Sequence, residues 1–378
     1  MSSRQIHLAL ALDGAGWHPA AWLEPDAVAA NSLFSASYWL DQVQRAEAGL
    51  LDFVTIEDGF LPRSDGSARG RLDASLIAAR VAPLTRNIGL IPTVTTAHTE
   101  PFHVSKTIAT LDYASTGRAG WRVQVGAGDA EIPLFGRRRP TEIGELLDEA
   151  ADHVEVVRRL WDSWQDDAEI RDAATGRFID RDKLHYIDFV GSHFSVRGPS
   201  ITPRPPQGQP LVVALAHASI PYAFAARSAD IVLVTPHSAD AIPGIVQEIR
   251  AAQAEAGRGD ERLLIFGEFV VFLDDDPAAA IARKERLDDV AGTPYHSDAP
   301  VFAGSPSALA DQLAAWADAG LDGFRLRPGA VPHDLAAVTD RLVPELQATG
   351  RFRRSYEADT LRGLLGFERA ANRYAVTA

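Results

Sequence analysis

The sequence contains no cysteine among its 378 residues, and this absence removes several kinds of chemistry at once. Disulfides, thiolate zinc sites, iron–sulfur clusters and cysteine nucleophiles all need a thiol. No apolar run reaches about 20 residues, so no membrane-spanning helix is predicted. The apolar run near the N-terminus is too short for a signal peptide and is soon followed by Asp13, which favours a cytoplasmic location.

Positive charge is in short supply. Lys and Arg number 37 against 51 Asp and Glu, which gives a formal net charge of -14. Because binding to nucleic acid favours a basic surface, this balance argues against a nucleic-acid partner. Hydrophobic residues at 46% and charged residues at 23% are ordinary for a globular protein. The length suggests about two to three domains, although an α/β barrel can use a whole chain of this size as one domain.

Short apolar runs recur along the chain at intervals that leave room for a helix between them. Most are nearly continuous in hydrophobicity, which is typical of parallel strands covered on both faces. The eight runs are residues 6–12, 52–56, 88–91, 119–125, 211–215, 230–234, 263–273 and 323–326.

Helical patterns lie between these runs. Apolar residues repeat at helical spacing over 39–46, 147–161 and 335–346, and Ser35 or Ser37 and Ser305 stand where helix caps are expected. Eight strand–helix alternations predict an α/β protein with a (β/α)8 TIM barrel, in one domain over residues 1–378. The alternative is a doubly wound open sheet. No Gly-x-Gly-x-x-Gly motif follows the first run, which weakens the dinucleotide-binding form of that alternative.

Three segments stand outside the repeat. Residues 165–210, after the fourth predicted helix, include a predicted hairpin around Gly191 and Ser192. Residues 291–305, in the region of strands 7 and 8, form a predicted long loop that could serve as a lid or binding loop. The tail 350–378 has more apolar residues than water tolerates, so we expect it to pack on the barrel exterior or on a neighbouring subunit.

In a TIM barrel the chemistry lies on the loops after the strands, so each such loop was read for reactive side chains. His18 follows the first strand, and a structural role for it is the alternative to catalysis. Glu57 and Asp58 follow the second strand, where capping of backbone amides is the simpler interpretation of this carboxylate pair. After the fifth strand, His217 or Ser219 precedes a helix whose N-terminus could bind an anion, or Ser219 is an ordinary cap.

No Ser–His–Asp order and no metal-ligand spacing is recognisable in the sequence. A barrel with aromatic and hydroxyl groups at its mouth, but without a catalytic trio, suits a protein whose reaction is carried by a bound cofactor. The sequence therefore predicts a cofactor-dependent enzyme with no metal.

The sequence resembles the bacterial luciferase-like flavin monooxygenases, in particular the nitrilotriacetate monooxygenase branch. No single motif is decisive, but the order and spacing of the similar segments together are specific. These segments are residues 16–22 (GWHPAAW), 53–59 (FVTIEDG), 87–104, 110–121 (TLDYASTGRAGW), 154–164 (VEVVRRLWDSW), 194–208 and, in the tail, 342–366.

The resemblance implies a TIM barrel that binds reduced FMN, supplied by a separate flavin reductase, and uses O2 to oxygenate a small organic substrate. It also implies a homodimer. Carried over by position, His18 is the catalytic candidate near the oxygen-reacting face of the flavin. The cofactor-binding candidates that match the family are Asp58, Thr95, Thr96 and His103.

The sequence departs from the family at the other flavin contacts. Arg122 to Gly126 replaces the pattern Asn-x-Val-Thr-Ser, so Arg122 and Val125 stand at contact positions. Leu147 replaces a tyrosine, and the phosphate turn Gly-Ser-Ser is replaced by a segment in which His217, Ala218 and Ser219 are the candidates.

These departures leave two alternatives open, an F420-dependent oxidoreductase of the same superfamily and a non-catalytic flavin-binding relative. Arginines 137–139 are either a solvated loop or a clamp for an anion.

Overall fold

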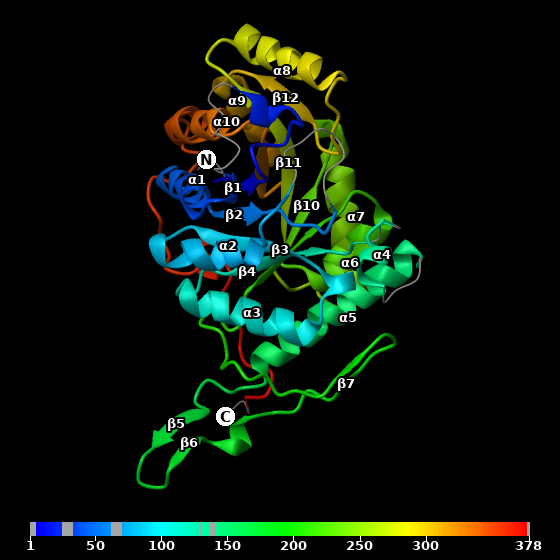
Figure 1. Cartoon of the computed structure of the whole chain (residues 1–378), viewed down its shortest axis with the longest axis vertical. Helices are drawn as coiled ribbons and strands as arrows, with labels where there is room; N and C mark the ends of the chain where they lie inside the picture. The colour runs from blue at the N-terminus through cyan, green and yellow to red at the C-terminus, as the bar shows by residue number, and fades with distance from the viewer. Residues whose placement is uncertain are drawn as a thin grey trace.

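A computed structural model describes residues 5–24, 33–61, 70–126, 128, 130–136 and 141–375. Its central feature is a closed barrel of eight parallel strands, as the sequence predicts (Figure 1). β1 pairs with β2 and β13, and pairing of β10 with β11 completes the ring. In hydrogen-bonded order the strands are β1 (His7–Leu12), β2 (Phe53–Ile56), β3 (Gly89–Thr95), β4 (Gly120–Gln124), β9 (Leu211–Leu215), β10 (Ile231–Val234), β11 (Leu264–Leu273) and β13 (Gly323–Pro328).

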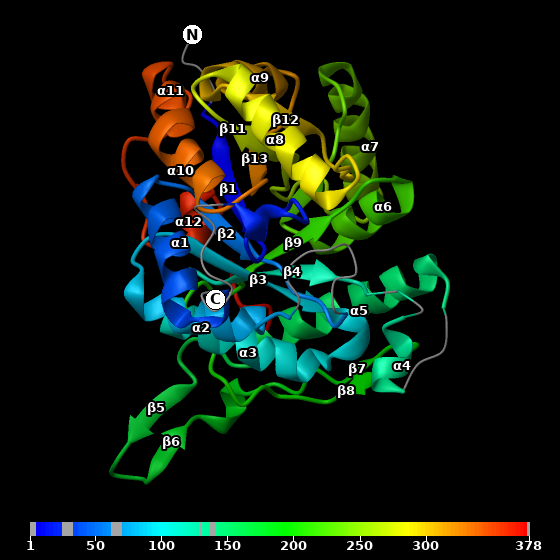
Figure 2. The ribbon, with the colours of Figure 1, turned by 45° about the horizontal axis from the view of Figure 1, so that its top comes forward.

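Helices surround the ring and bury their apolar stripes against the outer faces of the strands (Figure 2). The predicted caps are confirmed, since Ser35 Oγ accepts from Tyr38 N–H at 3.3 Å and Ser305 Oγ accepts from Ala308 N–H at 3.2 Å. The described α-helices are α1 (Ala36–Ala48), α2 (Ala74–Val81), α3 (Pro101–Ala114), α4 (Ile132–Phe135), α5 (Ile143–Asp162), α6 (Ser219–Ser228), α7 (Ile242–Glu255), α8 (Pro277–Ala291), α9 (Pro306–Asp318), α10 (His333–Ala337), α11 (Val343–Ala348) and α12 (Leu361–Leu364). None of the helices in these ranges is long and apolar enough to cross a membrane.

The two predicted insertions contain more regular structure than expected. The first holds the predicted hairpin, β7 (Phe189–Val190) with β8 (Ser195–Val196), and a second hairpin, β5 (Glu169–Asp172) with β6 (Arg177–Ile179), that the sequence analysis did not predict. The prediction that residues 291–305 form one long loop is wrong for the last part of this segment. There, β12 (Val301–Gly304) pairs in parallel with the outer half of β11.

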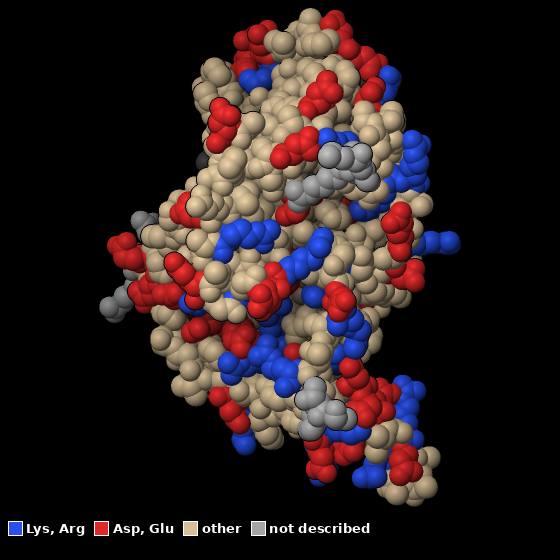
Figure 3. Space-filling view, turned by 180° about the vertical axis from the view of Figure 1, so that it is seen from behind, with Lys and Arg blue, Asp and Glu red and all other residues tan. Residues whose placement is uncertain are grey.

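The C-terminal tail packs on its own barrel, which confirms the first of the two expected positions. Leu361, Leu365 and Phe367 are buried against Phe53 and Phe266, whose side chains fill the barrel near the N-terminal ends of the strands. The tail therefore closes the floor of the barrel. Over the molecular face opposite to that in Figure 1, acidic and basic side chains are interspersed (Figure 3).

The barrel interior changes character from floor to mouth. Alternate residues of a strand point to opposite faces, so every second residue enters the ring. Near the floor these residues are apolar. Near the mouth β13 instead contributes Arg325 and Arg327, and β11 contributes Glu268, all of them buried. This charged layer lies beneath the candidate functional site.

Candidate functional site

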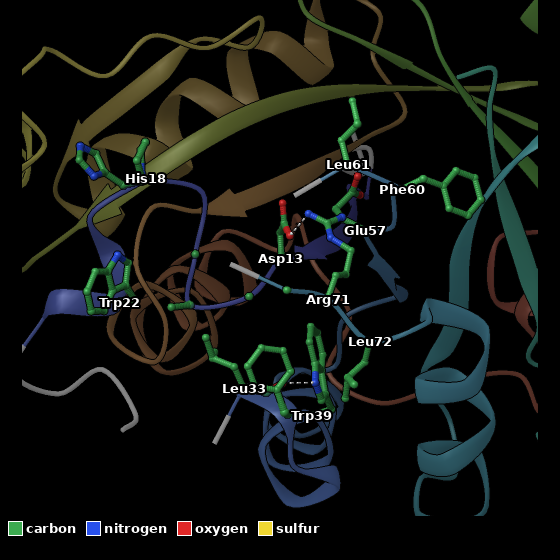
Figure 4. A pocket seen from close by; sticks show the side chains of 17 residues that line it. Asp13, His18, Trp22, Leu33, Trp39, Glu57, Phe60, Leu61, Arg71 and Leu72 are labelled. Atoms are coloured by element: carbon green, nitrogen blue, oxygen red, sulfur yellow. Dashed lines mark hydrogen bonds and ion pairs between the residues drawn. The ribbon is translucent and has the colours of Figure 1, made fainter. Parts of the chain in front are cut away.

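A cavity of about 240 Å³ opens at the mouth of the barrel, beside the loops that follow β1 and β2. Two stretches that come close in the fold, residues 33–34 and 70–72, complete its wall. Figure 4 shows the residues that surround it. The lining residues are Asp13, Gly14, Ala15, Gly16, His18, Pro19, Trp22, Leu33, Phe34, Trp39, Glu57, Gly59, Phe60, Leu61, Gly70, Arg71 and Leu72.

The wall of this cavity combines aromatic surface with one ion pair. Trp22, Phe34 and Phe60 are each more than a third exposed to solvent at the mouth. Arg71 Nη2 lies 3.0 Å from Asp13 Oδ1, and Figure 4 shows the pair inside the ring of apolar side chains. Aromatic walls with a few placed polar groups are typical of sites that hold a flat organic ligand.

Glu57 connects the cavity to the charged layer inside the barrel. It forms ion pairs with Arg122 and, at 2.8 Å, with Arg325 Nη1. Arg325 and Arg327 both pair with Glu268, and Arg325 Nη1 also donates to Thr55 Oγ1 at 2.7 Å. Three arginines and two glutamates are thus packed inside the ring.

The Glu57 carboxylate stays ionised because of these partners. Burial alone raises the pKa of Glu57, but the guanidiniums of Arg122 and Arg325 outweigh burial and hold its pKa at about 2. Burial likewise lowers the pKa of Arg122, while Glu57 opposes that change.

The outermost arginine of the layer is covered by the loop between α8 and β12. Asp298 Oδ1 and Oδ2 lie 2.5 and 3.1 Å from Arg327 Nη1 and Nη2. His217 Nε2 lies 3.6 Å from Asp298 Oδ2 on the other side. The indole of Trp17 stacks on Arg327 at 4.5 Å. The segment predicted as a lid therefore reaches the barrel mouth.

His18 lines the cavity, and both of its ring nitrogens have partners. Gly16, with φ at +132°, lets the first loop pass close to Gly329, whose carbonyl accepts from His18 N–H at 3.0 Å. His18 Nε2 lies 3.0 Å from Asp288 Oδ1, and Nδ1 accepts from Ala20 N–H at 3.1 Å. Burial lowers the pKa of His18 and Asp288 only partly offsets it, so the ring is neutral at pH 7, with its proton on Nε2.

Four of the predicted cofactor contacts come together around Gln124. Gln124 Nε2 donates to Thr95 Oγ1 and Gln124 Oε1 accepts from Arg122 Nη2, both at 3.3 Å. The backbone carbonyl of Gln124 accepts from Thr96 Oγ1, also at 3.3 Å. Val125 is the next residue, and its carbonyl accepts from Ala97 N–H at 3.3 Å. Thr95, Thr96 and Arg122 are buried. The chain thus brings these four candidates to one side of the mouth, and their role toward a cofactor stays a prediction.

Asp58 has the geometry of the simpler alternative. Its Oδ1 accepts from Gly59 N–H at 2.7 Å and its Oδ2 accepts from Ala74 N–H, the first amide of α2, at 2.9 Å. Both oxygens are therefore engaged by backbone. Burial raises the pKa of this carboxyl, and the two hydrogen bonds from backbone amides oppose the rise.

The remaining candidates lie apart from this group. Ala218 caps α6 without a side-chain hydrogen bond, and His217 and Ser219 beside it are exposed, with His217 Nδ1 at 3.0 Å from Thr235 Oγ1. His103 is exposed on the first turn of α3 and does not line the mouth cavity. The arginines at 137–139 lie outside the described residues.

Sequence reasoning missed Gln124, Glu268, Arg325 and Arg327. A signal for three of them was available, because Arg325 and Arg327 are two residues apart on a strand and Glu268 interrupts a ten-residue apolar run. Charges at such positions must be paired when the strand is covered on both faces.

Comparison with known proteins gives the class of this barrel. Residues 15–300 match the Luciferase-like monooxygenase family, and the chain belongs to that family. It is an oxidoreductase of the luciferase-like monooxygenase class.

Individual relatives match along nearly the whole chain. The N-acetyl-S-(2-succino)cysteine monooxygenase of Bacillus subtilis is 30% identical, over 98% of this chain and 99% of its own. Nitrilotriacetate monooxygenase component A of Aminobacter aminovorans is 29% identical, over 99% of both chains. The structure of a riboflavin lyase with modified FMN and riboflavin superimposes with a TM-score of 0.86 at 25% identity, over 97% of each chain.

Proposed function

We propose that this chain is the oxygenase component of a two-component monooxygenase, which uses reduced FMN and O2 to oxygenate a small organic substrate. The observation that carries the proposal is the aromatic cavity at the mouth of a luciferase-like barrel. In support, one relative is named as component A of its enzyme, and a related structure holds a modified FMN. The described residues form one parallel barrel and two small hairpins, with no second sheet for NAD(P)H.

The residues at the mouth fit a flavin mononucleotide. The aromatic wall suits a conjugated ring, and Gln124, Thr95 and Arg122 offer polar groups beside the strand ends. A phosphate needs hydrogen-bond donors, and the first amides of α6, which no side chain caps, are suitable ones. His217, the residue before Ala218, can add a ring N–H donor.

In this proposal reduced FMN supplies the activation of oxygen, and the chain supplies the surroundings. The apolar side chains of the cavity exclude water from the reacting groups. His18, held in one tautomer by Asp288 and Ala20, presents a neutral imidazole at the cavity wall. The charged layer fixes the position of Glu57 beneath it.

Absorption and fluorescence titrations with FMN, reduced FMN and F420 test the cofactor. We expect reduced FMN to bind and, together with a flavin reductase, NADH and O2, to support oxygenation. The pure protein with FMN but without the reductase should consume NADH only slowly. Rapid NADH consumption without the reductase would contradict the two-component arrangement. Binding of F420 alone would favour the hydride-transfer alternative, and flavin binding without turnover on any substrate would favour a non-catalytic relative.

A further inference from the structure

The charged layer inside the barrel has one more positive than negative charge, and Asp298 supplies the missing negative charge. Among the described residues it contains the three buried arginines at 122, 325 and 327 and the buried glutamates at 57 and 268. Burying an uncompensated charge is costly, so the extra guanidinium needs an anion. Asp298 provides that anion from the loop between α8 and β12.

Arg327 and Asp298 differ greatly in their surroundings. The Arg327 side chain is 1% exposed and its partner carboxylate is 41% exposed. The acid therefore approaches from the solvent side, on a loop, while the base is fixed in β13. The contact is a two-oxygen, two-nitrogen fork, which is the geometry by which arginine recognises any carboxylate.

Unused donors remain in the charged layer. Arg325 Nη2 and Arg327 Nε are fully buried and have no hydrogen-bond acceptor among the described residues. Buried guanidinium nitrogens are almost always paired, so two such atoms in one charged layer indicate that the layer can take more acceptor oxygens than Asp298 supplies. Trp17, stacked on Arg327, forms an apolar wall beside that guanidinium.

We propose that Arg327 is the carboxylate-binding residue of the substrate site, and that Asp298 occupies this position as an internal substitute until a substrate displaces it. The inference rests on the proposed function and names its substrate class, a small organic acid. The substrate carboxylate takes over the fork on Arg327, and Asp298 moves toward His217, which is 3.6 Å away.

Succinate binding to the apoprotein tests this without any flavin. Trp17 fluorescence is the reporter, and the Trp17→Phe variant identifies its share of the signal among the seven tryptophans. We expect succinate to bind the wild type weakly and the Asp298→Asn variant roughly ten-fold more tightly. A ten-fold difference follows if Asp298 occupies Arg327 in about nine-tenths of wild-type molecules. Asp275→Asn, which breaks an exposed pair with Arg341, is the matched control and should leave the affinity unchanged. Arg327→Lys keeps the charge but lacks the fork, and should weaken binding in the Asp298→Asn background about ten-fold.

Equal succinate affinity in the wild type and Asp298→Asn would overturn the proposal. The phosphate of FMN is the competing source of an anion, so FMN and riboflavin are titrated against the same two proteins. Tightening of FMN but not of riboflavin in Asp298→Asn, with succinate unaffected, would assign the position to the cofactor and would also overturn the proposal. If succinate behaves as expected while no flavin binds, the carboxylate site on Arg327 stands, and the proposed function fails together with the substrate role of that site.

Discussion

His18 Nε2 lies 3.0 Å from Asp288 Oδ1, so a residue of the first barrel loop is held by a residue 270 positions later, on α8. The other nitrogen accepts from Ala20 N–H, which leaves the imidazole one orientation and one tautomer. If His18 acts in catalysis, it therefore acts with a ring whose orientation is already fixed. Asp288 is the residue that positions this ring.

Replacing His18 should lower turnover without removing flavin. We expect His18→Ala to reduce kcat about ten- to hundred-fold and to leave the affinity for FMN within a few-fold, because a misplaced group affects the reaction more than binding. Asp288→Ala, which changes a residue outside the cavity wall, should also lower kcat, but by a smaller factor than His18→Ala. Loss of folding or of all flavin binding in His18→Ala would favour a purely structural histidine.

The same histidine should also affect stability as a function of pH. Burial lowers its pKa below 6.5, so its contribution to folding is present above that value and is lost as the pH falls through the folded-state pKa. The difference in unfolding free energy between wild type and His18→Ala, measured in urea at pH 7.5 and 5.5, should therefore shrink at the lower pH.

Glu57 should be a principal determinant of barrel stability. Glu57→Ala leaves Arg122 and Arg325 without a shared partner, so we expect a loss of about 3–5 kcal/mol in urea unfolding at pH 7. With a folded-state pKa of about 2 against an ordinary 4.5, this contribution is present above pH 4.5 and is lost as the pH falls toward 2. Glu261→Gln, at an exposed partner of Arg258, is the control and should cost less than about 1 kcal/mol. Equal effects of the two changes would contradict this account.

The start of α6 should respond to a single hydroxyl. Ala218→Ser adds a hydroxyl beside the first amides of α6, which no side chain caps. If the phosphate of FMN binds there, the same change should strengthen FMN binding by about 1 kcal/mol. His217→Ala should weaken FMN binding, because it removes a ring N–H donor beside the same amides. Fluorescence quenching measures these effects, and an equal affinity in all three proteins would place the phosphate elsewhere.

The floor of the barrel should be sensitive to one leucine of the tail. Leu361 is fully buried against the barrel interior, and Leu361→Ala should cost about 2–5 kcal/mol. Leu76 on α2 is 70% exposed, and Leu76→Ala should change stability by less than about 0.5 kcal/mol. Comparable losses from both would mean that the tail contributes little.

Assembly is a separate prediction. We expect a homodimer, and size-exclusion chromatography with light scattering decides between it and a single 40.8 kDa chain. Because the tail is buried on its own barrel, its apolar residues no longer require a second subunit.

The barrel could be predicted because each of its strands is a short apolar run followed by a helical pattern. β12 could not, because its four residues lie in a proline- and glycine-containing segment and pair only with the outer half of β11. The β5–β6 hairpin was also not predicted, because it has few apolar residues and is stabilised by local turns.

The candidate site was predictable at the level of loops and not of contacts. Sequence places Asp58 after a strand, but only the fold shows that both its oxygens face backbone amides. The partners of Glu57 come from β4 and β13, which no local pattern joins. Long-range pairing of this kind depends on closure of the ring.

Closure of the floor by the tail has a consequence for synthesis of the chain. Leu361, Leu365 and Phe367 are synthesised after every strand that they cover. Until then the ring has an open apolar end, the kind of surface that chaperones bind and that promotes aggregation. We expect a product that stops before residue 350 to be retained by chaperones and degraded.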